Sequence, residues 1–431
     1  MALSIKPYRG ARDFYPEDTF LRNYIFSIWR KVAESYGYEE YDAPILEPLE
    51  LYLAKTGEEI VNEQTYVFKD RGDRQVVIRP EMTPTVSRMV AAKRQELAYP
   101  LRWYSIPNLW RYERPQNGRL REHWQLNVDI FGIESLDAEI ELIEVANKMF
   151  ESFGADSSMY EIKLNHRGLI DHILKNYLSL SEASAIKIGK LIDKYHKLEK
   201  TKFISAVDEI LSAKEKENEV TEKLMLVLNS KSLKDLPKEI QDNDITKEIN
   251  KVEESLKKLG ITNASYDPTL MRGFDYYTGI VFEIFDTHPD NNRSMMGGGR
   301  YDGLVGLFGV QPVPTAGFGW GDVTLINFLE GHHLTPEIKN TVDIYVVVIG
   351  DNLDKSKEIV NKLRNAGINI ALDLTKKKIG DQIKTASKKS INYVLVIGDN
   401  ELKTQELNLK DLKTGKEESL TTDIIIKKFK K

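Results

Sequence analysis

The sequence contains no cysteine, and this absence excludes several kinds of chemistry. Without a thiol the chain cannot form a disulfide, act through a thiolate nucleophile or hold zinc with cysteine ligands. No run of apolar residues approaches the length that spans a bilayer. The first residues, MALSIKPYRGARDFYPED, carry acids and have no apolar signal core. We therefore expect a cytoplasmic protein that is neither exported nor inserted in a membrane.

Generic nucleotide-binding motifs are missing as well. Neither GxxxxGKS nor GxxxxGKT occurs, which excludes a P-loop. Gly317, Gly319 and Gly321 alternate ahead of a predicted helix, but they have neither the dinucleotide-binding spacing nor a surrounding βαβ unit. Taken alone, these glycines favour close packing of a strand against a helix.

The length and charge of the chain indicate several domains with different surfaces. A chain of 431 residues is too long for one compact core, so two or three domains are expected. The formal net charge of −5 is uneven: residues 342–431 hold 18 Lys and Arg against 13 Asp and Glu, a charge of +5, and the remaining 341 residues hold −10. This C-terminal segment either binds a polyanion or has a lysine-rich solvated surface.

Hydrophobic periodicity predicts an α+β core that is interrupted by helices and followed by a small α/β module. Helical spacing occurs in residues 19–36 and 137–153, and residues 65–79 indicate a hairpin. Leucine and isoleucine then recur three and four residues apart among lysines and glutamates, which is typical of an all-helical insertion. The predicted domains are 1–165 and 263–330 (split core), 166–262 (helical insertion), 331–341 (linker) and 342–431 (C-terminal module).

Three local features add to this organisation. Pro44 and Pro48 interrupt an extended segment, so we expect it at the margin of a sheet, where a subunit boundary could lie. Met295–Leu304, MMGGGRYDGL, is predicted to form a glycine-rich turn. The alternation of apolar strands and helices after residue 342 predicts a mostly parallel sheet.

Residues 101–132, LRWYSIPNLWRYERPQNGRLREHWQLNVDIFG, contain the clearest candidate for a binding surface. Two extended segments flank an arginine-rich loop of about ten residues, too short for a parallel crossover, so they are predicted to pair antiparallel. In the second segment Leu126, Val128 and Ile130 share the face that would meet helices. The opposite face is predicted to be a polar binding floor, formed by Arg111, Glu113, Gln125, Asn127 and Asp129.

Several segments, in order along the chain, resemble one enzyme family. Arg111–Pro115, RYERP, resembles motif 2 of the class II aminoacyl-tRNA synthetases, and YDAPILEP resembles motif 1. LMRGFDYYTGIVFE and GGGRYDGL resemble the two signature peptides of the histidyl-tRNA synthetases, and RPEMTPT and HWQLNVDIFG fit the same family. The resemblance covers essentially the whole chain, including the insertion and a C-terminal anticodon-binding module.

This resemblance implies a fold and a reaction. The fold is the class II antiparallel sheet flanked by helices, in a homodimer built through motif 1. The reaction is the two-step ligation of L-histidine to tRNA(His). The carboxylate of histidine attacks the α-phosphate of ATP, and the histidyl group then moves from the adenylate to the 3′ end of the tRNA. Mg²⁺ would accompany ATP, with no metal cage supplied by the protein.

The resemblance gives four residues roles on ATP. Attack of one anion on another needs fixed positive charge on the phosphate oxygens. Arg111 would bridge the carboxylate and the α-phosphate with its planar donor fork, and Arg272 would hold the α-phosphate; these two are the candidate catalytic residues. Glu113 would accept from the adenine amino group, and Arg119 would reach the outer phosphates.

Histidine would be held by two carboxylates. Glu81 would accept from the α-ammonium group, although an acid at a helix start is equally ordinary as a structural feature. Asp129, where bacterial members usually have glutamate, and Tyr277 would satisfy the imidazole nitrogens and so reject other ligands. Tyr276 and Tyr277 would face opposite sides of a strand. The predicted histidine-binding set is Glu81, Met82, Thr83, Arg111, Gln125, Asp129, Arg272, Tyr276 and Tyr277.

The sequence departs from the family pattern at motif 3. Where class II enzymes usually have an arginine for the γ-phosphate, this sequence has Thr324. Arg119 or Arg300 is the expected substitute. Asp322 either helps to hold magnesium or caps the helix that starts there.

Two other functions remain open at this point. The histidine-sensing regulatory subunit of ATP phosphoribosyltransferase shares this core, and the missing arginine favours it, but such regulators lack the C-terminal module and leave Arg111, Glu113 and Arg272 unexplained. An RNA-binding scaffold would give RYERP and RGFDYYTG no purpose. Lysines near the predicted helix 379–389 could position RNA through its phosphates: Lys376, Lys377, Lys378, Lys388 and Lys389.

Overall fold

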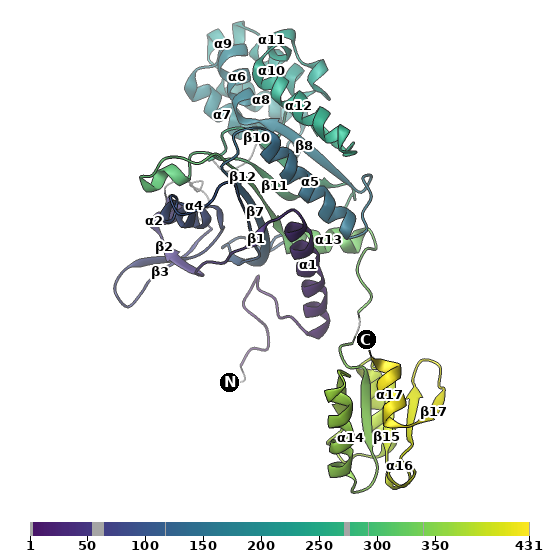
Figure 1. The fold of residues 1–431 in the computed structure, drawn as a ribbon. Helices are drawn as coiled ribbons and strands as arrows, with labels where there is room; N and C mark the ends of the chain where they lie inside the picture. Colours follow the sequence, from purple (N-terminus) through teal and green to yellow (C-terminus); the bar gives the residue numbers. More distant parts are fainter. Residues whose placement is uncertain are drawn as a thin grey trace. The chain divides into compact units, whose positions relative to one another are not determined.

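The computed structural model describes residues 3–53, 64–116, 118–270, 276–291, 293–338 and 340–430. The chain divides into two compact units between Pro336 and Glu337 (Figure 1). This division lies inside the segment predicted as a linker. Within the described ranges, no helix is both long enough and apolar enough to cross a bilayer.

A mostly antiparallel sheet forms the centre of the first unit. Its strands are β1 Glu39–Glu40, β5 Leu101–Ser105, β6 Asn108–Trp110, β7 Glu122–Phe131, β8 Tyr160–His166, β9 Ala264–Tyr266, β10 Ile280–Asp286, β11 Ser294–Arg300 and β12 Thr315–Gly321. In the described residues the order is β1-β5-β7-β12-β11-β10-β8-β9, with β6 paired to β7. The pairs β1–β5 and β8–β9, at the two edges, are parallel. The α+β class, the antiparallel pairing of β7 with β5 and β6, and the marginal position of β1 are confirmed.

A smaller sheet contains the predicted hairpin. It has the order β2-β4-β3, with β2 Leu46–Pro48, β3 Tyr66–Lys69 and β4 Gln75–Ile78. After it come Pro80 and the helix α4 Thr83–Ala92, whose buried face includes Val86 and Val90. The short helix α2 Glu50–Leu53 contacts α4, and the buried Tyr52 hydroxyl donates to the carbonyl of Glu81 over 3.2 Å. These contacts fix the start of α4.

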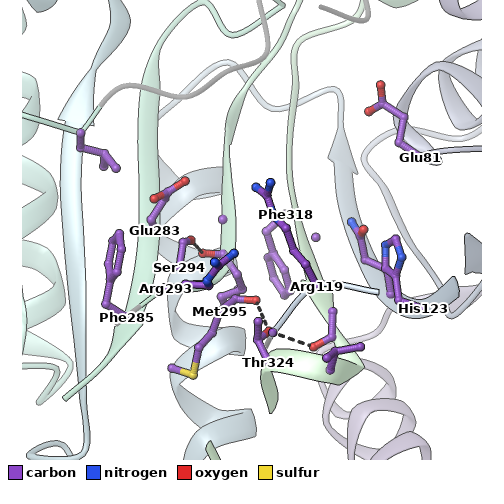
Figure 2. Close-up of a pocket in the computed structure, with 18 of the residues that line it drawn as sticks. Glu81, Arg119, His123, Glu283, Phe285, Arg293, Ser294, Met295, Phe318 and Thr324 are labelled. Atoms are coloured by element: carbon purple, nitrogen blue, oxygen red, sulfur yellow. Dashed lines mark hydrogen bonds between the residues drawn. The ribbon is translucent and has the colours of Figure 1, made fainter. Parts of the chain in front are cut away.

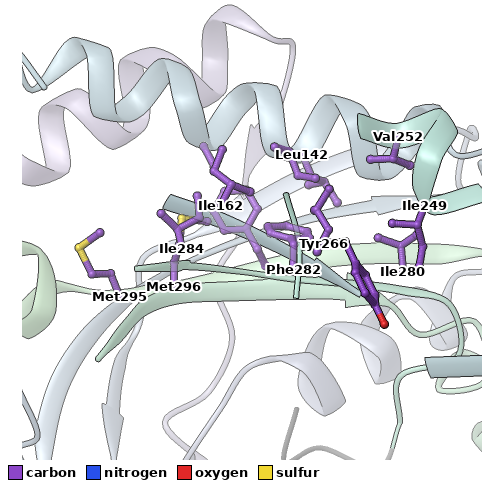
Figure 3. Packing of buried hydrophobic residues seen from close by; sticks show 14 of the residues in the cluster. Leu142, Ile162, Ile249, Val252, Tyr266, Ile280, Phe282, Ile284, Met295 and Met296 are labelled. Atoms are coloured by element: carbon purple, nitrogen blue, oxygen red, sulfur yellow. The ribbon is translucent and has the colours of Figure 1, made fainter. Parts of the chain in front are cut away.

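One face of the large sheet is covered by helices. These are α1 Pro16–Ser35, α5 Asp137–Ser152 and α13 Asp322–Gly331. The Phe150 ring of α5 lies 4.4 Å from Trp320 and 4.2 Å from Tyr160, between centroids. Figure 3 shows Leu142 of α5 packed over Ile162 and Phe282 of the sheet. The predicted apolar face of β7 belongs to this core: Leu126, Val128 and Ile130.

The predicted insertion between β8 and β9 is helical. Its α-helices are α6 Arg167–His172, α7 Glu182–Ile192, α8 Lys200–Ile210, α9 Ala213–Glu217, α10 Val220–Leu228, α11 Lys238–Gln241 and α12 Asp244–Lys258. The amphipathic helix α12 buries Ile249, Val252 and Leu256, and it contacts both α5 and β9. The insertion therefore returns the chain to the sheet beside the strand where it left.

The glycine-rich segment MMGGGRYDGL was predicted as a turn; this prediction is confirmed for residues 302–304 and wrong for residues 295–300. Residues Ser294–Arg300 form β11, a central strand between β10 and β12. A Cβ atom on Gly298 would lie 2.6 Å from Phe318 Cβ and 2.8 Å from Phe282 Cζ. Glycine is needed here because neighbouring strands approach too closely for a side chain. Within a strand, glycine can therefore mark close packing as well as a turn.

The second unit holds one sheet of order β14-β13-β15-β16-β17. Its elements are β13 Ile344–Val348, α14 Leu353–Asn365, β14 Ile370–Leu372, α15 Ile379–Lys388, β15 Tyr393–Ile397, α16 Asp399–Thr404, β16 Leu407–Asp411, β17 Glu417–Leu420 and α17 Thr422–Phe429. β13 is parallel to β14 and β15. The expected mostly parallel sheet is wrong for the other half, because β16 and β17 add antiparallel through a short turn.

Candidate active site

The sheet face opposite α1 and α5 forms the floor of a cavity of about 1140 Å³ (Figure 2). β7, β10, β11 and β12 contribute to its lining, together with the start of α4 and residues 111–120. Side chains alternate across a strand, so Gln125, Asn127 and Asp129 line this cavity while their neighbours in β7 enter the core. The volume is suited to ligands of cofactor size.

Most of the predicted site residues meet in this one cavity. Met82 does not, because its side chain is fully buried and is absent from the cavity wall. Arg272 lies outside the described residues. The predicted residues that line the cavity are Glu81, Thr83, Arg111, Glu113, Arg119, Gln125, Asp129, Tyr276 and Tyr277.

Asp129 is a buried carboxylate with one oxygen left for a ligand. Its Oδ1 accepts a hydrogen bond from the Tyr301 hydroxyl, and its Oδ2 has no hydrogen-bond partner among the described residues. Burial raises the pKa of Asp129 to about 7, and the hydrogen bond from Tyr301 opposes this shift. The pKa of Tyr301 is held well above its ordinary value by burial and by the Asp129 charge, so the phenol keeps its proton and donates.

The glycines of β12 make room for the polar side chains of β7. Gly317 pairs with Asp129 and Gly319 with Asn127. A Cβ atom on Gly317 would meet the Asp129 carboxylate and would lie 2.9 Å from the Tyr301 hydroxyl; one on Gly319 would meet the amide of Gln125. The interpretation of these two glycines as strand–helix packing is therefore wrong. The absence of side chains at these glycines leaves space into which the side chains of β7 extend over β12.

The two adjacent tyrosines correct another expectation. Tyr276 and Tyr277 precede β10 in an irregular segment, so strand alternation does not separate them, and both line the cavity. Their ring centroids are 4.8 Å apart, and the Tyr276 hydroxyl donates to Glu81 Oε2 over 3.4 Å. Glu81 is 3% exposed and precedes the first residue of α4 by two positions, so it lies before the helix start.

Arg111 and His123 both line the cavity, the first as a cation and the second as a neutral imidazole. Arg111 Nε donates to the carbonyl of Pro80 over 2.9 Å, which fixes the direction of its guanidinium. Burial, and then the charge of Arg111, lower the pKa of His123 to about 3, so the imidazole is neutral at physiological pH. Sequence reasoning missed His123, since a lone histidine in HWQLNVDIFG gives no signal of its surroundings.

Glu113 and Arg119 lie at the end of the cavity formed by the motif 2 loop. Arg119 Nε is 3.2 Å from Glu113 Oε2, an ion-pair distance. The angle does not make this contact a hydrogen bond, and Glu113 Oε2 has no hydrogen-bond partner among the described residues. Glu113 therefore retains a buried acceptor, while part of the Arg119 charge is balanced by a carboxylate.

Arg300, one of the two expected substitutes for the motif 3 arginine, is committed elsewhere. Its Nε and Nη2 each donate over 2.7 Å to the Glu139 carboxylate, and its Nη1 and Nη2 also donate to the carbonyls of Ile133 and Ser135. Breaking such a buried pair costs about 3–5 kcal/mol. Arg300 is absent from the cavity wall. The proposal that it binds outer phosphates is therefore wrong.

Asp322 is also used within the protein. Its Oδ2 accepts from Arg12 Nη2 over 2.7 Å and its Oδ1 from the backbone N–H of Trp124 over 3.1 Å. It is the first helical residue of α13 and follows Gly321 at the N-cap, so it is not the N-cap residue. Asp322 is therefore neither the N-cap residue nor available as a magnesium ligand. Its ion pair with Arg12 and its bond to Trp124 join the N-terminal segment, β7 and α13.

Other contributors to the cavity had weak or no sequence signals. Tyr301 stood inside GGGRYDGL, but that segment was interpreted as a turn. Asp193, Lys194, His196 and Lys197 of the insertion also line the cavity. His196 Nε2 is 2.8 Å from Thr269 Oγ1. Periodicity had marked the insertion as surface helices without any link to the site. Within the described ranges, no group of three or more His, Asp or Glu side chains is arranged to hold a metal.

Comparisons with known proteins agree with this geometry. The family model for histidyl-tRNA synthetase matches residues 10–321, and that for an anticodon-binding domain matches residues 343–431. The histidine–tRNA ligase of Leptospira biflexa is 43% identical, over 99% of this chain and 98% of its own length. The histidine–tRNA ligase of Thermoplasma volcanium is 35% identical, over 97% of both chains.

Solved structures show the same architecture. The histidyl-tRNA synthetase of S. aureus, in its apo form, has a TM-score of 0.75 and 27% identity, with 99% of this chain and 100% of that chain covered. The histidyl-tRNA synthetase of Nostoc sp. has a TM-score of 0.81 over the same shares, at 23% identity, and supports the fold. Together with the matched family models and relatives, these likenesses place the chain in the histidyl-tRNA synthetase family.

Proposed function

We propose that this chain ligates L-histidine to tRNA(His) through a histidyl-adenylate intermediate formed from ATP. The observation that carries the proposal is the single cavity in which two buried carboxylates, Glu81 and Asp129, share walls with Arg111 and Arg119. Carboxylates suit the cationic and hydrogen-bonding groups of histidine, and arginines suit its carboxylate and the phosphates of ATP.

Histidine binds with its ring toward Asp129. The unpartnered Oδ2 accepts from one imidazole N–H, while Tyr301 holds the other oxygen and so fixes the carboxylate plane. Tyr277 is the partner proposed for the second ring nitrogen, and Glu81 is proposed to accept from the α-ammonium group. A ligand without these donors leaves buried polar groups unpaired, which disfavours it strongly.

Activation depends on positive charge placed before the reaction starts. Arg111, held by the carbonyl of Pro80, bridges the attacking carboxylate and the α-phosphate and lowers their mutual repulsion. Glu113 accepts from the adenine amino group through Oε2, which has no hydrogen-bond partner among the described residues. Arg272 is proposed to hold the α-phosphate. Magnesium enters with the phosphates of ATP as part of the substrate.

The remaining partners follow from the second unit and the family. The second unit matches the anticodon-binding family and carries the net charge of +5, so it is proposed to bind the anticodon end of the tRNA. A homodimer formed through the motif 1 segment and a cytoplasmic location are part of the same proposal.

The test has two stages. Exchange of pyrophosphate into ATP, dependent on histidine, measures adenylate formation, and charging of histidine tRNA measures transfer. Absence of exchange with folded protein would remove the synthetase function and leave a histidine-sensing role. Exchange without charging would locate the fault in tRNA recognition.

A further inference from the structure

The wall of the cavity contains a further arginine, Arg293. Arg293 directly precedes β11 and lines the cavity wall, and Figure 2 shows it beside Ser294 and Met295. It is half-buried. Among the described residues its side chain forms no ion pair and no hydrogen bond. The cavity wall does include carboxylates, but no ion pair joins one of the described carboxylates to Arg293. A guanidinium in this position suits an anionic ligand.

Arg293 lies where the motif 2 loop meets the first turn of α13. A Cβ atom built on Gly118 would be 3.4 Å from Arg293 Cδ and 3.8 Å from Thr324 Cγ2. Gly118 is the neighbour of Arg119 in the loop. Three segments far apart in the sequence therefore converge on one point of the cavity.

Thr324 itself supplies no charge at this point. Its hydroxyl donates toward the carbonyls of Met295, over 3.0 Å, and Gly321, over 3.2 Å. This hydroxyl ties α13 to β11, two residues from Arg293. The threonine thus fixes the strand that presents Arg293.

The other arginines of the cavity have partners within the protein. Arg119 is paired with Glu113, and Arg111 Nε is bonded to Pro80. Arg293 is therefore the described cavity arginine with all of its donors available for a phosphate.

We propose that Arg293 binds the outer phosphates of ATP, and the pyrophosphate that leaves, in place of the cation absent at Thr324. This proposal rests on the proposed function, because it takes ATP as the ligand of the cavity. Arg119 shares these phosphates from the loop side, and Arg293 meets them from the end of the sheet.

Arg293→Ala tests this assignment, because it should weaken binding of ligands that carry the outer phosphates and leave binding of the adenylate part unchanged. The KM for ATP in histidine-dependent exchange should rise about ten- to hundredfold, since hydrogen bonds to charged groups are lost. The KM for pyrophosphate in the reverse reaction should rise similarly. Binding of a sulfamoyl analogue of histidyl-adenylate, which has no outer phosphates, should stay within about twofold, as should the melting temperature.

Two further variants and a control separate the possible outcomes. Arg293→Lys should recover part of the ATP affinity, and Thr324→Arg placed on the Arg293→Ala background should recover it from the neighbouring segment. Arg71→Ala, exposed in the β3–β4 turn, should change nothing.

An unchanged KM for ATP in an otherwise active Arg293→Ala protein would overturn the assignment. So would an equal loss of affinity for the adenylate analogue, which would show a structural role. An inactive wild-type protein would instead contradict the proposed function, so the two failures are distinct.

Discussion

Two buried aspartates of the first unit lie beside β12, Asp129 on β7 and Asp322 at the start of α13, and they are used in opposite ways. Asp129 lies opposite Gly317 and is 4% exposed; Asp322 follows Gly321 and is fully buried. Burial raises the pKa of both. At Asp322 each oxygen has a protein donor, whereas Asp129 keeps Oδ2 unpaired among the described residues.

This difference shows how a carboxylate that stabilises the fold can be told from one that is available to a ligand. Buried polar groups are nearly always paired inside a protein, so the orphan oxygen marks the position that waits for a ligand. A strongly shifted pKa alone would not have separated the two aspartates, because ion pairs in the framework also perturb pKa values. The count of satisfied oxygens does separate them.

The largest expected effect is on histidine activation by Asp129→Ala. Removing the carboxylate should lower kcat/KM for histidine about a thousandfold or more, because the imidazole loses its buried acceptor. The free energy of unfolding should not fall, since an ionised carboxylate in this place is costly to the fold. Pyrophosphate exchange and urea unfolding measure the two quantities, with the exposed Asp354→Ala as control. A stability loss that matched the activity loss would contradict the distinction from Asp322.

Asp322→Ala should show the reverse pattern. Loss of this carboxylate leaves Arg12 without its partner and should lower the free energy of unfolding by about 3 kcal/mol, as expected for one half of a buried pair. Arg12→Ala should act in the same direction, and the double variant should lose less than the two single losses together. Urea unfolding of all four proteins completes the cycle. Additive losses would show that the ion pair is not the cause.

A methyl group on the floor should have an intermediate effect. Gly319→Ala places a Cβ atom against the flexible side chain of Gln125, so the fold should persist while the KM for histidine rises about tenfold, one lost contact of about 1.4 kcal/mol. Gly380→Ala is the matched control, because no atom lies within 4 Å of a Cβ atom at that position. An unchanged KM would show that Gln125 can move aside without loss.

The stability of the unliganded fold should also depend on pH. Because the pKa of Asp129 is raised to about 7 in the folded protein from 3.8, the folded state binds more protons between these values. The free energy of unfolding should therefore fall as pH rises from about 4 to about 7, and this contribution should be flat above. Asp129→Asn should lack the decline. The difference between the two proteins, measured by urea unfolding across this range, isolates the contribution, and a constant difference would refute it.

Sequence patterns were reliable where one period dominates. Alternation in β7 assigned Asp129 and Leu126 to opposite faces, and helical spacing located α1, α5 and the insertion. Sequence patterns failed where the same residues are compatible with two different local structures. The glycines of β11 looked like a turn, and Tyr276 beside Tyr277 looked like a strand pair. For the glycines the deciding quantity is the distance to neighbours that are remote in the chain, and for the tyrosines it is that β10 begins only at Ile280.

The sequence by itself determined the family, the order of the segments and the polar floor, because these depend on local periodicity and on motifs that read along the chain. Only the tertiary structure decided which charged side chains are already paired within the protein. By sequence Arg300 is a candidate to replace the motif 3 arginine, but in the structure it is paired with Glu139, 161 residues away. No sequence pattern indicates a role for Arg293. Its position follows from the contacts that bring the loop at Gly118 and the helix residue Thr324 next to it. A charge is available to a ligand only if no protein partner has already balanced it, and that is a property of contacts between distant segments.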